Sequence, residues 1–156
     1  MIRNASREYE NVGETDIKGL ETTLRYMTPW NLDLGLGYTY MTAKDKDSAT
    51  SEETDAEFIP DHKFTLDARY FFDFGLTAAL QLVYTGEQYE YENSGDKYTI
   101  SDFTVVNAKL NQAFSFTEKI SSDIFIEVKN LFDENYEEGS GPMPGRNFLA
   151  GISFNF

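Results

Sequence analysis

Cysteine is missing from this sequence of 156 residues, which excludes a disulfide framework and a thiolate metal site. No stretch approaches the roughly 18 to 20 consecutive apolar residues that a membrane-spanning helix needs. Basic residues are few, since 13 Lys and Arg stand against 27 Asp and Glu and give a formal net charge of -14. Because contacts to phosphates need a basic surface, this charge argues against a nucleic-acid partner.

A secretory signal is missing as well. The residues IRNASREYE that follow Met1 are polar from the start. We expect either that a signal was removed and a start codon added, or that the chain is a piece of something longer.

Apolar and polar residues alternate with a period of two through most of the chain. In residues 32–40, Leu and Tyr alternate with Asp, Gly and Thr. Such a pattern predicts a β-strand with one apolar face. Seven strands are predicted in this way, over residues 20–26, 32–40, 63–72, 76–85, 106–111, 124–129 and 147–156. An eighth strand, over residues 2–11, alternates poorly and is supported only by its place before the turn NVGETD.

The connections between these strands alternate in length. The short ones are residues 27–31, 72–75 and 116–122, and the long, acidic ones are residues 42–61, 86–98 and 132–146. In an antiparallel arrangement all short turns lie at one end of the sheet, and eight strands place both termini at that end. We therefore predict an all-β fold, an antiparallel transmembrane β-barrel of about eight strands with short periplasmic turns and long acidic extracellular loops.

The alternation alone does not say which face points inward. A soluble lipocalin-like cup with Leu and Phe inside shows the same pattern. Aromatic residues, however, make up 15% of the chain and gather near strand ends on the apolar face, as at a membrane interface. The polar face mixes both charge signs, as a crowded interior needs if each charge is to be paired. We favour the membrane barrel, with a lumen filled by polar side chains and with Leu34, Leu80, Leu110 and Ile126 facing lipid.

Three stretches resemble the C-terminal part of TonB-dependent outer-membrane receptors: YENVGETDIKGLE, FIPDHKFTLDARY and VKNLFDENYEEGSGPMPGRNFLAGISFNF. In that family a Y-x-N-x-G and G-x-E pattern, a Pro-x-His, an N-L-F-D-x-x-Y segment, a P-G-R and a terminal aromatic residue follow in this order. Here they are Tyr9, Asn11 and Gly13 with Gly19 and Glu21, then Pro60 and His62, Asn130 to Asp133 with Tyr136, Pro144 to Arg146, and Phe156.

The resemblance implies several properties. It implies the outer membrane of a Gram-negative bacterium, contact with its lipid, and a parent receptor that takes up a siderophore or similar nutrient through a small-molecule site at the extracellular loops. The terminal alternation ending in Phe156 resembles the signal read by the barrel-insertion machinery.

The sequence also departs from the family. Members carry a plug domain, a TonB box and a barrel of about 22 strands, and this chain can hold only the last third of such a barrel. We expect residues 1–156 to form a single β-barrel domain without plug or box, which closes as a small barrel or pairs with a second copy and does not transport by itself. A small structural barrel with no ligand is the alternative.

No motif for catalysis stands out, and we assign no catalytic residue, no cofactor-binding residue and no metal ligand. His62 is the only histidine and is interpreted as a strand-start residue at a loop boundary, because no nucleophile motif surrounds any Ser. Two acidic clusters offer oxygen ligands suited to calcium but lack the ordered spacing of a dedicated loop, so we interpret them as solvated surface. They are Glu52, Glu53, Asp55 and Glu57, and Glu134, Glu137 and Glu138.

Overall fold

The computed structural model describes residues 2–3, 9–10, 13–47, 52–91, 96–139 and 141–156. These residues form strands, turns and loops only, so the predicted all-β class is confirmed for them. In the same part of the chain there is no helix of the length and apolarity required to cross a membrane.

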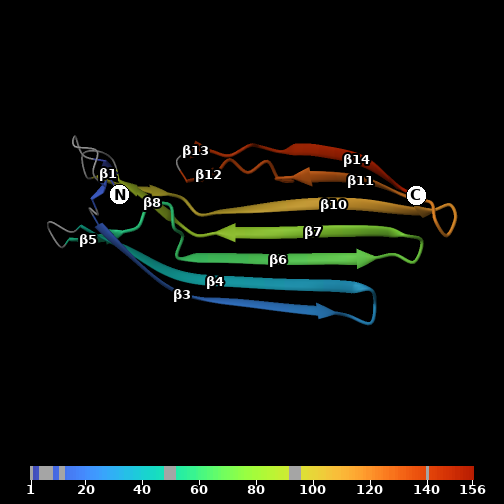
Figure 1. Cartoon of the computed structure of the whole chain (residues 1–156), viewed down its shortest axis with the longest axis horizontal. Helices are drawn as coiled ribbons and strands as arrows, with labels where there is room; N and C mark the ends of the chain where they lie inside the picture. The colour runs from blue at the N-terminus through green and yellow to red at the C-terminus, as the bar shows by residue number, and fades with distance from the viewer. Residues whose placement is uncertain (1, 4–8, 11–12, 48–51, 92–95, 140) are drawn as a thin grey trace.

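One antiparallel sheet dominates the structure (Figure 1). Its strands follow one another in the order β14-β11-β10-β7-β6-β4-β3, and the short β5 (Glu53–Asp55) pairs with β4. The bounds are Gly13–Met27 for β3, Leu32–Asp47 for β4, His62–Phe71 for β6, Leu76–Thr85 for β7, Phe103–Ser115 for β10, Ser121–Lys129 for β11 and Asn147–Asn155 for β14. All seven strands predicted from alternation are therefore present, and β3, β4 and β10 extend several residues beyond the predicted segments.

Short turns and long connections separate to opposite ends of the sheet, as predicted (Figure 1). The turn before β7 requires glycine at position 75. Gly75 has φ +88, and a Cβ there would lie 2.9 Å from the carbonyl oxygen of Ala113, so glycine relieves both a strained backbone and a clash. The turn before β4 uses a side chain instead, because Thr28 Oγ1 accepts hydrogen bonds from the backbone N–H groups of Trp30 and Leu32 at 3.3 and 3.1 Å.

Three small antiparallel pairs complete the described structure. They are β1 (Ile2–Arg3) with β2 (Tyr9–Glu10), β8 (Gln88–Tyr91) with β9 (Lys97–Ile100), and β12 (Glu137–Glu138) with β13 (Gly141–Pro142). The β8–β9 and β12–β13 pairs give local order to two of the long connections.

The predicted eighth strand is wrong where the structure describes it. Residues 2–3 and 9–10 pair with each other instead of joining the main sheet, and the rest of the predicted strand lies outside the described residues. The physical reason is the poor alternation of IRNASREYEN, which offers no apolar face to continue that of β3. With seven strands along its path, the sheet starts at the loop end, so the two termini lie at opposite ends (Figure 1).

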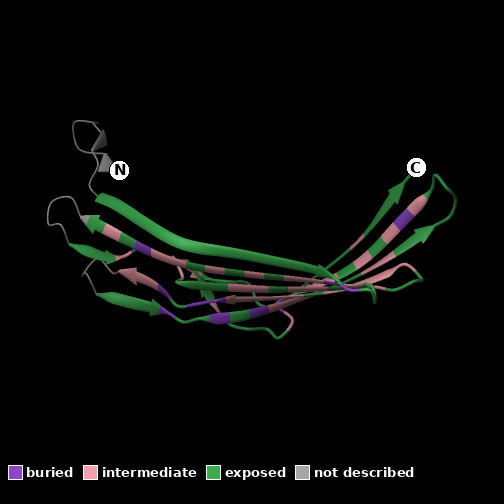
Figure 2. Ribbon diagram, turned by 90° about the horizontal axis from the view of Figure 1, so that it is seen from below, coloured by how far each residue is buried: buried purple, intermediate pink, exposed green. Residues whose placement is uncertain are grey.

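The sheet is curved but does not close on itself (Figure 2). Within the described residues, no strand pairs with the outer edge of β3 or with that of β14. The expected closure into a small barrel is therefore not seen in this chain. A closed barrel of the smallest common kind needs about eight strands, tilted and staggered around the axis, and the described residues of the segment that was expected to supply the eighth, 2–3 and 9–10, pair with each other instead.

Strand register sorts the side chains into two faces. Leu24, Leu36, Leu66 and Leu82 stand opposite one another on four neighbouring strands and belong to the outer face. The outer face leaves large apolar side chains uncovered, with Leu24 65% and Leu80 53% exposed. A continuous apolar surface of this extent is unfavourable in water and suits lipid.

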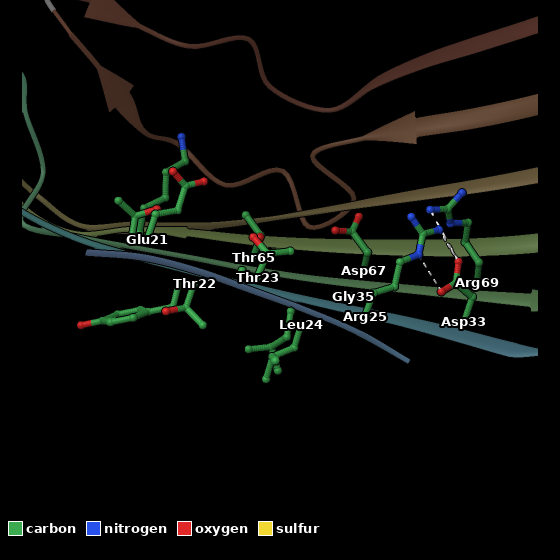
Figure 3. A pocket seen from close by; sticks show the side chains of 15 residues that line it. Glu21, Thr22, Thr23, Leu24, Arg25, Asp33, Gly35, Thr65, Asp67 and Arg69 are labelled. Atoms are coloured by element: carbon green, nitrogen blue, oxygen red, sulfur yellow. Dashed lines mark hydrogen bonds and ion pairs between the residues drawn. The ribbon is translucent and has the colours of Figure 1, made fainter. Parts of the chain in front are cut away.

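The opposite face, which we call the inner face, is polar and hollowed. Figure 3 shows Glu21, Arg25 and Asp67 pointing to one side of the sheet and Thr22 and Leu24 to the other. This arrangement contradicts the alternative of a soluble lipocalin-like cup, in which the apolar face would line the hollow. The inner face carries Glu21, Thr23, Arg25, Asp33, Gly35, Gly37, Thr65, Asp67, Arg69, Gln81, Asn107, Lys109 and Glu127.

Two adjacent residues of β6 test which face meets lipid. In lipid vesicles, and with the strands that complete its two open edges present, the sheet should be destabilised by Leu66→Arg by roughly 2 to 4 kcal/mol, the cost of an Arg near the bilayer midplane. Thr65→Arg, at the same depth on the inner face, should cost much less because carboxylates such as Asp67 are within reach. Urea unfolding of both variants in vesicles measures the difference. Equal losses for the two variants would contradict the assignment of faces.

Candidate functional site

A groove runs over two glycines on the inner face of β4. Gly35 and Gly37 place no side chain in the groove, and side chains of β6 lie close to both, since a Cβ at Gly37 would lie only 2.5 Å from Thr65 Oγ1 and one at Gly35 would lie 3.4 Å from the Cβ of Asp67. The hollow above them has a volume of about 270 Å³. Charged side chains of both signs surround this inner groove (Figure 3): Glu21, Arg25, Asp33, Lys63, Asp67 and Arg69.

An acid shared by two arginines closes one end of the inner groove. Two guanidinium nitrogens of Arg25 donate hydrogen bonds to the Asp33 carboxylate, Nε to Oδ1 at 3.0 Å and Nη2 to Oδ2 at 2.5 Å. Arg69 Nη2 lies 3.7 Å from the same Oδ2 atom. The Asp33 side chain is only 6% exposed, whereas those of Arg25 and Arg69 are 62% and 45% exposed. The carboxylate is therefore neutralised within the sheet, while both guanidinium groups remain accessible from the groove.

Side-chain hydrogen bonds continue from the inner groove across three strands. Gln81 Nε2 donates to Asp67 Oδ1 at 3.0 Å, and Asn107 Nδ2 donates to Gln81 Oε1 at 3.1 Å. Asn107 Oδ1 in turn accepts from the backbone N–H of Asn130 at 3.0 Å. This series, which we call the amide relay, links β6 in the middle of the sheet to the first residue after β11.

Asn130 then organises the connection between β11 and β14. Its Oδ1 accepts from the Glu134 N–H and its Nδ2 donates to the Glu134 carbonyl, both at 2.8 Å. Asn130 is 3% exposed and has φ +53, a conformation that Asn tolerates better than most residues. Asn130 Nδ2 also lies 3.4 Å from the carbonyl oxygen of Pro144, on the far side of the loop.

The two motifs that carried the family resemblance meet in this loop. Asp133 Oδ1 accepts from the backbone N–H of Arg146 at 2.7 Å, and a Cβ on Gly145 would approach Asp133 Oδ1 to 2.8 Å. The N-L-F-D segment is therefore tied to the P-G-R segment by side-chain to backbone contacts. Sequence reasoning identified both segments but not this pairing, which depends on how the loop folds back.

The long connections at the loop end contact one another. Asp55 of β5 forms ion pairs with Lys44 and, at 2.8 Å, with Lys97. The hydrogen bond from Lys44, with a further one from Lys97, holds the pKa of the Asp55 carboxyl below its usual range. Tyr91 N–H donates to Glu57 Oε1 at 2.8 Å. Two acids of the first predicted cluster therefore serve to dock neighbouring loops.

Neither acidic cluster is arranged as a cation site. Among the residues that the structure describes, no group of three or more His, Asp or Glu side chains is placed to hold a metal ion. His62 begins β6, as interpreted from the sequence, and its Nδ1 lies 3.0 Å from the Tyr38 hydroxyl. The Tyr40 ring lies 5.2 Å from the imidazole, so His62 belongs to an aromatic cluster at the loop end of the outer face.

A pocket lies between the connection that contains β9 and the one that contains β12 and β13. It has a volume of about 300 Å³. Tyr136 forms one wall and packs on Phe103, with ring centroids 4.3 Å apart. We call it the loop pocket, and its principal lining residues are Tyr98, Ile100, Asp102, Tyr136, Glu137 and Met143.

Taken together, an apolar outer face, a charged and hollowed inner face, short turns at one end and interacting loops at the other define a piece of the wall of an outer-membrane β-barrel. Residues 2–131 match the family described as TonB dependent receptor-like, beta-barrel. The chain belongs to this family, whose members are receptors and transporters of the outer membrane of Gram-negative bacteria. The match ends at residue 131, so most of the loop held by Asn130 lies beyond it.

Known relatives agree with this assignment. The chain is 27% identical over 128 residues to the ferrichrome outer membrane transporter/phage receptor of Escherichia coli strain K12, covering 80% of this chain and 17% of the relative. The crystal structure of the ferric citrate transporter FecA has the same fold, with a TM-score of 0.75, 23% identity, and coverage of 92% of this chain and 24% of that one. The ferric-catecholate import receptor Fiu from K12 E. coli gives a TM-score of 0.69 and 24% identity, over 98% of this chain and 22% of that one.

The chain thus spans about a fifth of the length of the relatives that it matches. A partial barrel wall explains why its sheet has two open edges, since the rest of a full-length barrel would supply the neighbouring strands.

Replacing Asn130 tests how its side chain orders the connection between β11 and β14. Asn130→Ala removes three side-chain contacts and places Ala at positive φ, so we expect amide hydrogen exchange at Glu134 to rise about tenfold, the equivalent of one lost hydrogen bond. Asn130→Gly loses the same contacts without the backbone strain and should show a smaller global destabilisation. Asn155→Ala, at the opposite end of the sheet, serves as the control. Unchanged exchange at Glu134 in both Asn130 variants would show that the loop folds without the Asn130 side chain.

Proposed function

We propose that this chain forms part of the barrel wall of a TonB-dependent receptor that takes up an iron-siderophore complex or a similar scarce nutrient. The observation that carries the proposal is the combination of a lipid-compatible outer face with a charged inner groove on a sheet whose two edges are open. Backbone N–H and C=O groups at an open edge have no hydrogen-bonding partner in a bilayer, so the sheet needs further strands before it can span a membrane. For this reason the chain does not transport by itself.

Residues 1–156 act as one unit of that barrel. This proposal is supported by the main sheet, in which each strand from β3 to β14 along the path is hydrogen-bonded to the next without a break. We infer that the unit contributes to binding the nutrient and to its passage through the barrel, and not to catalysis. The polar side chains of the inner face form ion pairs and side-chain hydrogen bonds that hold the sheet and its loops.

Loss of the protein should impair nutrient uptake. Disruption of the gene in its native host is expected to abolish energy-dependent uptake of radioactive iron from at least one chelate in a panel of hydroxamate, catecholate and carboxylate siderophores. Restoring the intact gene should restore uptake, and restoring a Leu66→Arg gene should restore less of it, since that variant is expected to be destabilised in lipid. Wild-type uptake of every chelate in the disrupted strain would refute the proposal.

The partners of this unit are outer-membrane lipid, the barrel-insertion machinery and, at the loop end, a small-molecule ligand. Phe156 follows β14 directly, and its ring continues the alternation of apolar residues along that strand. We propose that the insertion machinery recognises the Phe156 ring together with the alternating outer-face residues of β14.

Shortening the chain by one residue tests that recognition. Deletion of Phe156 should lower the amount of folded protein in the outer membrane, measured by its resistance to unfolding in cold detergent, because the aromatic ring is lost. Phe156→Tyr keeps an aromatic ring and should assemble normally. The recognition proposal would fail if the deleted form assembled as well as Phe156→Tyr.

A further inference from the structure

We propose that the loop pocket binds a positively charged group of the ligand, an ammonium or guanidinium carried on an apolar body. This inference rests on the proposed function and narrows its substrate class to nutrient complexes that carry a free cationic group.

The walls of the loop pocket suit such a group. Ile100, only 3% exposed, and Met143 provide an apolar surface, and the rings of Tyr98 and Tyr136 stand beside it. An electron-rich aromatic face attracts a cation, most strongly where water is partly excluded. Burial, with a further effect of the Glu138 charge, raises the pKa of Tyr136, so its phenol stays neutral in the physiological range and keeps its hydrogen-bonding hydroxyl.

Two carboxylates make the loop pocket negatively charged. Asp102 and Glu137 both line it, and no Lys or Arg is found among its described lining residues. No ion pair found between described residues uses either acid.

The basic residues of the neighbouring loops have other partners. Lys97 contacts Asp55 at 2.8 Å and lies 3.4 Å above the centre of the Tyr89 ring. Arg146 Nη2 lies 3.8 Å from Asp133. An arriving cation therefore meets no competing positive charge among the residues that line the loop pocket.

The loop pocket is also formed before any ligand arrives. Met143 N–H donates to the Tyr136 carbonyl at 3.0 Å, which folds the β12–β13 pair over the pocket. Gly139 N–H donates to Gln88 Oε1 at 3.4 Å and connects this pair to β8. Because these contacts order the walls in advance, little conformational entropy is lost when a ligand binds.

Charge-matched chelates test the inference. We would measure binding of radioactive iron to outer membranes from cells that express the protein, using hydroxamate, catecholate and carboxylate iron complexes. Each complex is prepared with a free terminal ammonium and in an acetylated, neutral form. For the chelate class that the receptor accepts, the ammonium form should bind about tenfold more tightly, as expected for one charge-assisted contact.

Matched variants locate the effect. In the double variant Asp102→Asn with Glu137→Gln, the two forms should bind equally well. The control is Asp73→Asn with Glu118→Gln, which removes the same charge at the opposite end of the sheet and should keep the preference.

The outcomes separate the two proposals. Equal binding of the charged and neutral forms to the unaltered protein, or a preference that persists in the Asp102 and Glu137 variant, overturns the inference and leaves the proposed function standing. Binding of no complex in any chelate class overturns both.

Discussion

The backbone hydrogen-bonding ladder between neighbouring strands is the constraint on which the rest of this structure depends. Because lipid offers no hydrogen bonds, each peptide group of a spanning strand must pair with the next strand. That pairing sets the register, and the register decides which side chains share a face. Leu66 stands with the leucines of the outer face, while its neighbours Thr65 and Asp67 face the groove. A slip of one residue would exchange the two faces and turn charges towards lipid.

Charged side chains on the inner face are arranged so that a buried charge has a partner of opposite charge. Asp33 is nearly inaccessible, and its carboxylate is held by Arg25 with Arg69 nearby. Asp67 forms no ion pair among the described residues and accepts a hydrogen bond from Gln81 instead, and the amides of Gln81 and Asn107 extend this hydrogen bonding to Asn130. The same side chains that make the sheet compatible with a polar interior therefore also position the loop after β11, so stability and loop geometry are coupled.

The loop end carries the features that differ most from a plain barrel wall. Loops on a rigid scaffold are where binding chemistry commonly resides. Here three connections contact one another through Asp55 and Gln88, and Tyr136 packs on Phe103 at the start of β10. Much of the acidity of the chain lies in these connections. Part of it is used in docking, as for Asp55 and Asp133, and part remains available, as for Asp102 and Glu137. The open edges of the sheet, together with coverage of about a fifth of known relatives, describe a piece of a larger receptor.

The sequence by itself determined the strands, their two faces and the separation of short turns from long loops. These features follow from local periodicity and turn composition, so one pass along the chain recovers them, as for residues 32–40 or Gly75. Only the tertiary structure decided that residues 2–3 and 9–10 pair with each other outside the main sheet and that, among the described residues, the edges of this sheet stay open. It also decided that Asn130 joins Asn107 to Pro144 and that Asp102 and Glu137 share a pocket with Tyr136. Those relations join residues far apart in the chain, and alternation carries no information about which distant side chains meet.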